Sequence, residues 1–320
     1  MLLSLVPAGP VSKLRRIIGR VLLLAAALGL AGCSMVRVAY DQAPKLGFWW
    51  IDGYLDFDEA QSARVHEAIE RWFAWHRRSQ LPEVAGLLAR AQREIVEPVT
   101  PAAMCAWAAE AQRRLGLALD EALPAAAELM LTIRPEQLRH LERRFRKNED
   151  EMREEFLQPD PAERRAESFE RTLKRFENLY GRLDAPQREL LARQSAASSF
   201  DAERWLAERR LRQRDVLQAL ATLSSAARTG DDRDALLLQA RSAAQALAAQ
   251  ATRSPRADYR AHQERLMQEN CALAAAVHNA TSRAQREAAR ARLKGWEDDL
   301  RLLAAAPGTR LGGAAAADSR

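Results

Sequence analysis

The motifs that mark many enzyme and metal-binding families are missing from this chain. It has only five histidines and three cysteines. None of them forms an H-E-x-x-H, Glu-x-x-His or C-x-x-C pattern, which would indicate zinc, di-iron or redox chemistry. A glycine-rich phosphate loop and the G-x-S-x-G nucleophile turn are absent as well. We therefore expect no cofactor and no metal, and we favour a protein that is not an enzyme.

The chain also lacks an apolar run long enough to cross a bilayer as a helix. The run from Val21 to Leu30 follows four basic residues, whereas a spanning helix needs about twenty apolar residues. This is the pattern of a secretory signal peptide. The less favoured alternative is an N-terminal helix that is never cleaved.

A lipid attachment site follows that run directly. The sequence Leu30-Ala31-Gly32-Cys33 resembles the lipobox of bacterial lipoproteins, in which the cysteine thiol is acylated and the preceding signal is removed. We expect residues 1–32 to be cleaved and Cys33 to carry the lipid, since several acyl chains anchor a protein stably. Lipoproteins kept at the inner membrane usually carry Asp after the cysteine, so Ser34 favours the outer membrane, facing the periplasm of a Gram-negative bacterium.

The chain has little net charge once the signal is removed. Its formal charge is +6. Four positive residues lie in the signal, namely Lys13, Arg15, Arg16 and Arg20, so the mature chain carries +2. Elsewhere arginine and glutamate alternate, as in Glu142-Arg143-Arg144, which is typical of a solvated helix face. A nucleic-acid partner would need a one-sided basic stripe. We exclude nucleic acid and expect contact with the membrane, and with envelope proteins or peptidoglycan.

Aromatic and β-branched residues are sparse, and this predicts an all-α fold. Leu, Ala, Arg, Glu and Gln dominate, and these residues favour helices. We expect an antiparallel multi-helix bundle of roughly nine helices over residues 58–306, preceded by an anchor and aromatic tether at 33–57 and followed by a disordered tail at 307–320. The expected helix starts are Asp58-x-x-Gln61, Thr100-Pro101, Thr132 to Gln137, Asp184-x-x-Gln187, Ser254-Pro255 and Ser282-x-x-Gln285.

Three further expectations concern how these helices continue. We expect a break near Leu81-Pro82 and a kink or split at Pro124, because proline disrupts a helix interior. The capping sequences recur at uneven intervals, so they indicate no repeat period.

The tether is rich in aromatic residues that allow two interpretations. They could lie among lipid headgroups, where amphipathic rings are favoured. We prefer the interpretation that they dock the tether onto the bundle, because buried aromatic rings contribute strongly to packing. The residues are Tyr40, Phe48, Trp49, Trp50, Tyr54 and Phe57.

A candidate cluster follows on the first long helix, comprising Trp72, Trp75, His76, Arg77 and, farther along the chain, Asn148. His76 shares a helix face with Trp72, and a single histidine there is more often a hydrogen-bonded structural residue than a catalyst. We expect Asn148 to be a buried, hydrogen-bonded residue too.

Two cysteines besides Cys33 remain, Cys105 and Cys271. In an oxidising compartment we expect them to form a disulfide, which would stabilise the fold by about 3 to 5 kcal/mol on the chain-entropy model. The alternative is a pair of buried free thiols.

The chain resembles the Gram-negative lipoproteins of domain of unknown function family 6279. The resemblance extends from Cys33 to about Leu303, and it implies the location and a helical fold without implying any chemistry. It rests on Cys33-Ser34, Trp49-Trp50-Ile51-Asp52-Gly53-Tyr54, Ala60-Gln61, Trp75-His76-Arg77, Leu81-Pro82, Pro135-Glu136-Gln137, Phe145-Arg146-Lys147-Asn148, Leu179-Tyr180-Gly181, Asn270-Cys271-Ala272-Leu273, His278-Asn279 and Asp298-Asp299-Leu300.

Taken together, these features predict an outer-membrane lipoprotein whose helical body binds or supports other envelope components. One alternative is a hydrolase or lyase of cell-wall polymer that uses carboxylates such as Glu154, or the region of His76. Another is a periplasmic carrier or chaperone with an apolar cavity. An enzyme would need a pocket that holds an acid or base with a perturbed pKa. A carrier would need a dry cavity, and a scaffold would need an exposed apolar patch.

Overall fold

The structure is a computed structural model, and it describes residues 34–230 and 232–306. Within these ranges it contains eleven α-helices and one π-helical segment. They are α2 (Ser34–Leu55), α3 (Glu59–Trp75), η2 (His76–Gln80), α4 (Leu81–Glu94), α5 (Pro101–Met130), α6 (Pro135–Phe156), α7 (Pro161–Tyr180), α8 (Ala185–Ala196), α9 (Ala202–Thr229), α10 (Arg233–Ala249), α11 (Ala257–Ala280) and α12 (Arg283–Ala305). The predicted all-α bundle is confirmed. None of the described helices has the length and apolar character needed to cross a membrane.

Capping chemistry starts most helices where the sequence predicts. Full capping boxes open α3 at Asp58, α8 at Asp184 and α12 at Ser282, and Thr100 caps α5. Each cap side chain satisfies a backbone N–H that has no partner within its helix. The start predicted at Ser254-Pro255 is wrong, because α11 begins only at Ala257.

Proline interrupts the helices less than predicted. No loop separates α3 from α4 at Leu81-Pro82, because the π-helical turn η2 joins them, so the predicted break is wrong. Similarly, α5 continues through Pro124 to Met130. The carbonyl that loses its partner there belongs to Asp120, which is exposed and can therefore hydrogen-bond to water.

The helix-start glutamines join distant turns in pairs. Gln61 and Gln137 exchange side-chain hydrogen bonds of 3.2 and 2.7 Å, and so link the α2–α3 turn to the α5–α6 turn. Gln187 and Gln285 do the same at 2.8 and 2.9 Å, and link the α7–α8 turn to the α11–α12 turn. All four capping glutamines therefore also form tertiary contacts.

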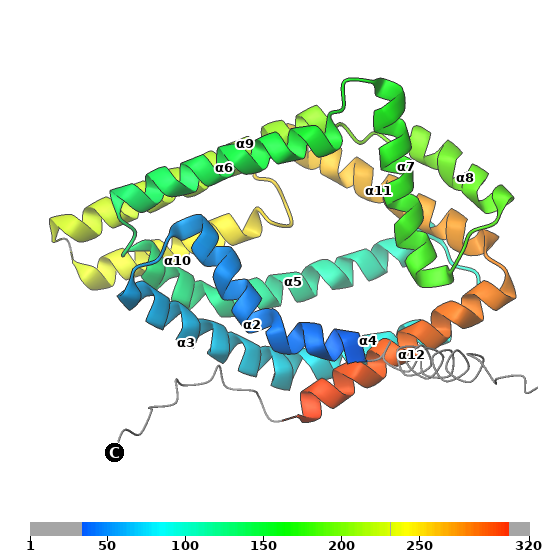
Figure 1. Cartoon of the computed structure of the whole chain (residues 1–320), viewed down its shortest axis with the longest axis horizontal. Coiled ribbons are helices and arrows are strands. Elements are labelled where there is room, and N and C mark those ends of the chain that lie inside the picture. The colour runs from blue at the N-terminus through cyan, green and yellow to red at the C-terminus, as the bar shows by residue number, and fades with distance from the viewer. Residues whose placement is uncertain (1–33, 231, 307–320) are drawn as a thin grey trace, which may run out of the picture.

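Each pair lies within one half of the chain, the first within α2–α6 and the second within α7–α12, and the two halves are arranged similarly. In each half the first helix contacts the last: α2 packs on α6, and α7 packs on α12. The corresponding contacts between halves are α4 with α12 and α9 with α6. In Figure 1, α6 and α9 run along one edge and α4 and α12 along the opposite edge, with α5 between them.

The apolar core forms two clusters, and the larger one joins the two halves. The larger cluster lies where α5, α6, α9 and α10 meet, around Ile133, Leu141 and Leu223. The smaller lies among α7, α8, α11 and α12, around Leu183, Leu191 and Val277. Helix α5 packs against α10 and α11, so it connects both ends of the molecule and borders the space between the clusters.

Candidate functional site

The predicted aromatic cluster forms a joint between helices. Trp72 stacks on His76 with ring centroids 4.8 Å apart, and its indole N–H donates to the carbonyl of Ala118 on α5. The Tyr40 hydroxyl, from α2, lies 2.9 Å from Nδ1 of His76. Burial lowers the pKa of His76 and raises the pKa of Tyr40 to about 12. The histidine is therefore kept neutral by packing.

Arg77 extends this joint to α12. The residue is 8 % exposed, and its side chain donates to the carbonyl of Leu303 on α12 at 3.0 Å. A second nitrogen lies 3.2 Å from a carboxylate oxygen of Asp41 on α2. Trp75 lies beside His76, with ring centroids 6.2 Å apart. The structural interpretation of Trp72, Trp75, His76 and Arg77 fits these contacts.

Asn148 does not join that cluster. It lies on α6, is half-buried, and accepts a hydrogen bond from Arg209 on α9. The sequence predicted a hydrogen-bonded residue here but gave no sign of the helix that it faces. Its partner Arg209 lines a cavity, and this cavity is the more promising site.

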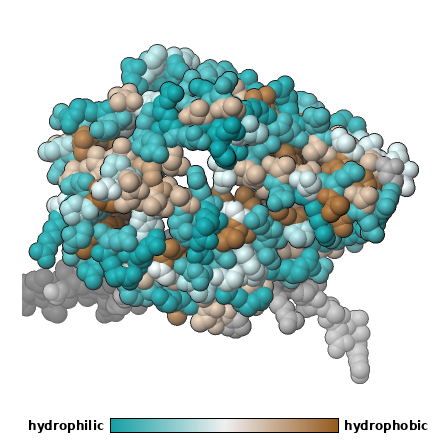
Figure 2. All heavy atoms as spheres, turned by 180° about the vertical axis from the view of Figure 1, so that it is seen from behind, coloured by the Kyte–Doolittle hydropathy of each residue, from teal (hydrophilic) through white to brown (hydrophobic). Residues whose placement is uncertain are grey.

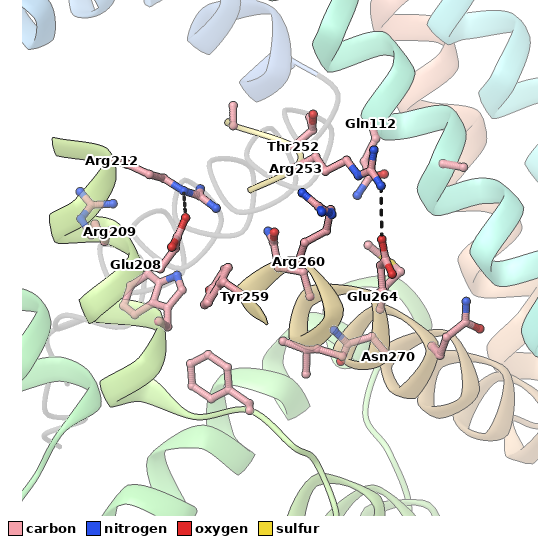
Figure 3. Close-up of a pocket in the computed structure, with 18 of the residues that line it drawn as sticks. Gln112, Glu208, Arg209, Arg212, Thr252, Arg253, Tyr259, Arg260, Glu264 and Asn270 are labelled. Carbon is pink, nitrogen blue, oxygen red and sulfur yellow. Dashed lines mark hydrogen bonds and ion pairs between the residues drawn. The ribbon is translucent and has the colours of Figure 1, made fainter. Parts of the chain in front are cut away.

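The cavity lies between the two halves and has a volume of about 1050 Å³. Its walls come from α5, α6, α9, α11 and the segment between α10 and α11 (Figure 3). The surface of the molecule is hollowed near its middle in Figure 2. Lining residues include Gln112, Arg113, Phe200, Trp205, Glu208, Arg209, Arg212, Gln213, Arg253, Tyr259, Arg260, Gln263, Glu264, Gln268 and Asn270.

The predicted disulfide is present and fixes two of these walls. Cys105 on α5 is bonded to Cys271 on α11, and their Cα atoms lie 5.3 Å apart. The neighbouring Gln268 lines the cavity and lies near the Cys105 sulfur. The bond therefore sets the spacing between α5 and α11 at the cavity.

Positive charge exceeds negative charge in the cavity lining. Five arginines face two glutamates there. Arg212 pairs with Glu208 at 3.1 Å and Arg253 pairs with Glu264 at 3.7 Å. Arg113 pairs with Glu110, which is not part of the lining. Among the residues that the structure describes, the other two arginines of the lining have no carboxylate partner.

Those two are Arg209 and Arg260. Arg209 donates to the neutral amide of Asn148, and its Nε is buried without a partner. Arg260 donates only to the main-chain carbonyls of Ser254 and Pro255, at 3.1 and 3.2 Å. Figure 3 shows Arg212 and Arg260 on α9 and α11, with Tyr259 beside them. A guanidinium in this state can bind a carboxylate or phosphate through charge-assisted hydrogen bonds.

Glu208 is the most buried carboxylate of the lining, and its partners hold it in place. It is 3 % exposed. Its Oε1 accepts from Ser254 at 2.8 Å and from Arg256 at 3.1 Å, in addition to Arg212. Arg256 also pairs with Asp215. These three donors hold the carboxylate and connect α9 to the segment between α10 and α11.

Amides and aromatic rings complete the lining. Burial raises the pKa of Tyr259, whose ring lies 5.9 Å from the Arg212 guanidinium carbon. Trp205 and Phe200 pack together on one side, with ring centroids 6.4 Å apart. Arginines, amides and aromatic rings together suit a polar, anionic ligand that also offers apolar faces.

Other sequence candidates do not form a site. Glu154 is exposed, and Glu149 from the same acidic run pairs with Arg210. Within the described ranges no three His, Cys, Asp or Glu residues gather as metal ligands would. Leu30, Ala31, Gly32 and Cys33 lie outside the described residues. The cavity itself had no sequence signal, because its residues come from separate helices and form no local motif.

Comparisons with known proteins give a family and nothing more specific. No curated protein and no solved structure matches the chain. A family model does match over residues 53–245, which is more than half of the chain. The chain therefore belongs to the family of unknown function DUF6279.

Proposed function

We propose that this protein is an outer-membrane lipoprotein, anchored through Cys33, whose helical body binds a carboxylate-bearing component of the envelope without transforming it. The observation that carries the proposal is the pair of cavity arginines, Arg209 and Arg260, that have no carboxylate partner. Peptidoglycan is the class of ligand that we favour, because its peptide carboxylates and sugar rings match guanidinium, amide and aromatic groups.

The two alternatives have less support. A hydrolase or lyase would need a free acid or base in the cavity, whereas Glu208 and Glu264 both pair with arginines and no histidine belongs to the lining. A carrier of apolar ligands would need a dry cavity without charged groups, whereas five arginines and two glutamates line this one. The mixture of groups favours recognition of a polar anion.

The binding proposal can be tested with purified peptidoglycan. The mature lipoprotein in detergent is sedimented with peptidoglycan sacculi, alongside the double variant Arg209→Gln/Arg260→Gln. We expect the apparent Kd of the variant to rise at least about tenfold, since each hydrogen bond to a charged group contributes about 1.5 to 3 kcal/mol. Added salt should weaken binding of the unsubstituted protein, because ions in the solvated cavity screen the attraction between the arginines and the ligand's carboxylates.

A matched control separates the cavity from general surface charge. Arg143→Gln removes an exposed arginine on α6, outside the cavity lining, and should leave sedimentation unchanged. Circular dichroism checks that all variants remain helical. Equal sedimentation of the cavity variant and the Arg143 variant would contradict the proposal.

A further inference from the structure

The aromatic residues of α2 separate into an inward and an outward set. Tyr40 packs against Phe73 and His76, Phe48 stacks on His66, and Tyr54 lies against Phe145. These contacts agree with the predicted docking of the tether for Tyr40, Phe48 and Tyr54 only. Two other aromatic residues, Trp49 and Trp50, are each 68 % exposed.

The exposed tryptophans belong to an apolar face of the helix. Val38 is 59 % exposed and Leu46 is 56 % exposed. At 100° per residue, Val38, Leu46, Trp49 and Trp50 fall within an arc of about 120°. Gln42 and Lys45 are the exposed polar residues on or beside this arc. Water-soluble surfaces rarely gather so many large apolar side chains, so this face indicates a binding surface.

The position of this face in the chain indicates what covers it. Helix α2 begins at Ser34, the residue after the expected attachment point Cys33, and the apolar run from Val21 ends at Leu30. Whether the thiol is acylated or that run stays attached, the chain just before α2 is held in a membrane. From Ser34 to Trp50 the helix spans at most about 24 Å at 1.5 Å per residue, because it bends near Pro44 (Figure 1). Only a helix that lies along the membrane brings both ends of the apolar face to the lipid.

We propose that α2 lies on the phospholipid surface, with Val38, Leu46, Trp49 and Trp50 among the headgroups and upper acyl chains. Tryptophan is enriched at this depth, where its ring is apolar and its N–H can still bond to water or headgroups. Lys45 at the margin can contact phosphate groups, as in other interfacial helices. The inference rests on the proposed anchor only in that some lipid or apolar segment holds residue 33 at the membrane.

The test uses the full mature lipoprotein in vesicles of phosphatidylethanolamine and phosphatidylglycerol with brominated acyl chains. Bromine quenches nearby tryptophan fluorescence, and five of the seven tryptophans lie in α3 to α12. We expect clear quenching relative to unbrominated vesicles, and loss of most of it in the variant Trp49→Ser/Trp50→Ser. Both residues are exposed, so the variant should remain folded.

A second variant keeps the fluorophores and changes the surface. Leu46→Asp places a charge between Val38 and Trp49, and it should lower the quenching by at least half. Leu238→Asp is the matched control, because Leu238 is 70 % exposed and lies on α10, away from the apolar face of α2 in the sequence. An equal loss of quenching in both aspartate variants would overturn the proposal. So would a dimer in solution that depends on Trp49 and Trp50.

The mass of the N-terminal peptide separates this inference from the proposed anchor. An acylated Cys33 together with absent quenching overturns the docking of α2 and leaves the lipoprotein assignment intact. A Cys33 without acyl groups together with quenching overturns the anchor and supports the docking. Binding to peptidoglycan is measured independently in detergent.

Discussion

At the scale of single residues, the buried histidine His278 joins three parts of the chain. It is 1 % exposed. Its Nε2 lies 2.7 Å from the carbonyl of Glu97, so this nitrogen must donate. Nδ1 then accepts from the hydroxyl of Tyr180 at 2.8 Å. Burial lowers the pKa of His278 and raises the pKa of Tyr180 to about 12. The neutral imidazole is the form that the fold stabilises.

This arrangement predicts a loss of stability in mild acid. Below about pH 6.5 the unfolded chain gains a proton on His278 that the folded chain resists, so the free energy of unfolding falls until pH reaches the lowered pKa. His76 contributes with the same sign, because burial also lowers its pKa. Urea unfolding between pH 7.5 and 5 should show the decline, with a limiting slope of about 1.4 kcal/mol per pH unit for each histidine.

The variant His278→Gln tests the origin of that slope. It should be less stable at pH 7.5, because a polar group loses buried hydrogen bonds, and its stability should depend less on pH. Tyr180→Phe should also cost about 1 to 3 kcal/mol at pH 7.5, since Nδ1 loses its donor. An unchanged slope in His278→Gln would show that other groups cause the acid sensitivity.

At the scale of helices, sequence patterns predicted starts better than connections. Capping is local, so the boxes at Asp58, Asp184 and Ser282 were visible in the sequence. Ser254, which precedes a proline, was also predicted to start a helix, but its hydroxyl donates to the buried Glu208 and accepts from the N–H of Arg256 without capping α11. That choice depends on a carboxylate 46 residues away, which no local rule detects. The pairing of capping glutamines is hidden for the same reason.

Gln187 shows how much such a pair should contribute. It is 3 % exposed, accepts from the Asp184 N–H, and donates to Ala280 and Gln285. Gln187→Leu leaves these buried groups without partners and should lower the free energy of unfolding by about 2 to 5 kcal/mol. Urea unfolding followed by circular dichroism measures this, with the exposed Gln194→Leu on the same helix as control.

A double-mutant cycle gives the pairwise part of that effect. Gln187→Leu/Gln285→Leu should cost at least about 1 kcal/mol less than the sum of the single variants, because the two amides bond to each other. Strict additivity would mean that the two turns are stabilised independently, against the observed exchange of hydrogen bonds.

At the scale of the whole molecule, the two halves create a feature that neither contains alone. The cavity lies where α5 of the first half faces α9 and α11 of the second. Composition and capping motifs predicted the helices, and the expected oxidising compartment predicted the disulfide. The packing of the halves could not be predicted. The sequence signal that the halves share is a glutamine at a helix start, and these glutamines lie at unequal intervals along the chain.

The disulfide cross-links the two halves, and its reduction should therefore affect both stability and binding. It joins residues 166 apart in the sequence, so the chain-entropy model gives a stabilisation of up to about 5 kcal/mol. We expect reduction to lower the urea midpoint strongly, and the variant Cys105→Ala/Cys271→Ala to unfold at the same lower midpoint without reductant. Mass spectrometry should show a gain of two hydrogens on reduction of the unsubstituted protein.

Reduction should also weaken the sedimentation with peptidoglycan, because α5 and α11 both contribute to the cavity wall and the bond holds them together. The double alanine variant, which contains neither thiol, should show the same weaker binding and no further response to reductant. Unchanged binding together with a lowered urea midpoint would mean that the apolar clusters alone position the cavity, and that the bond serves stability only.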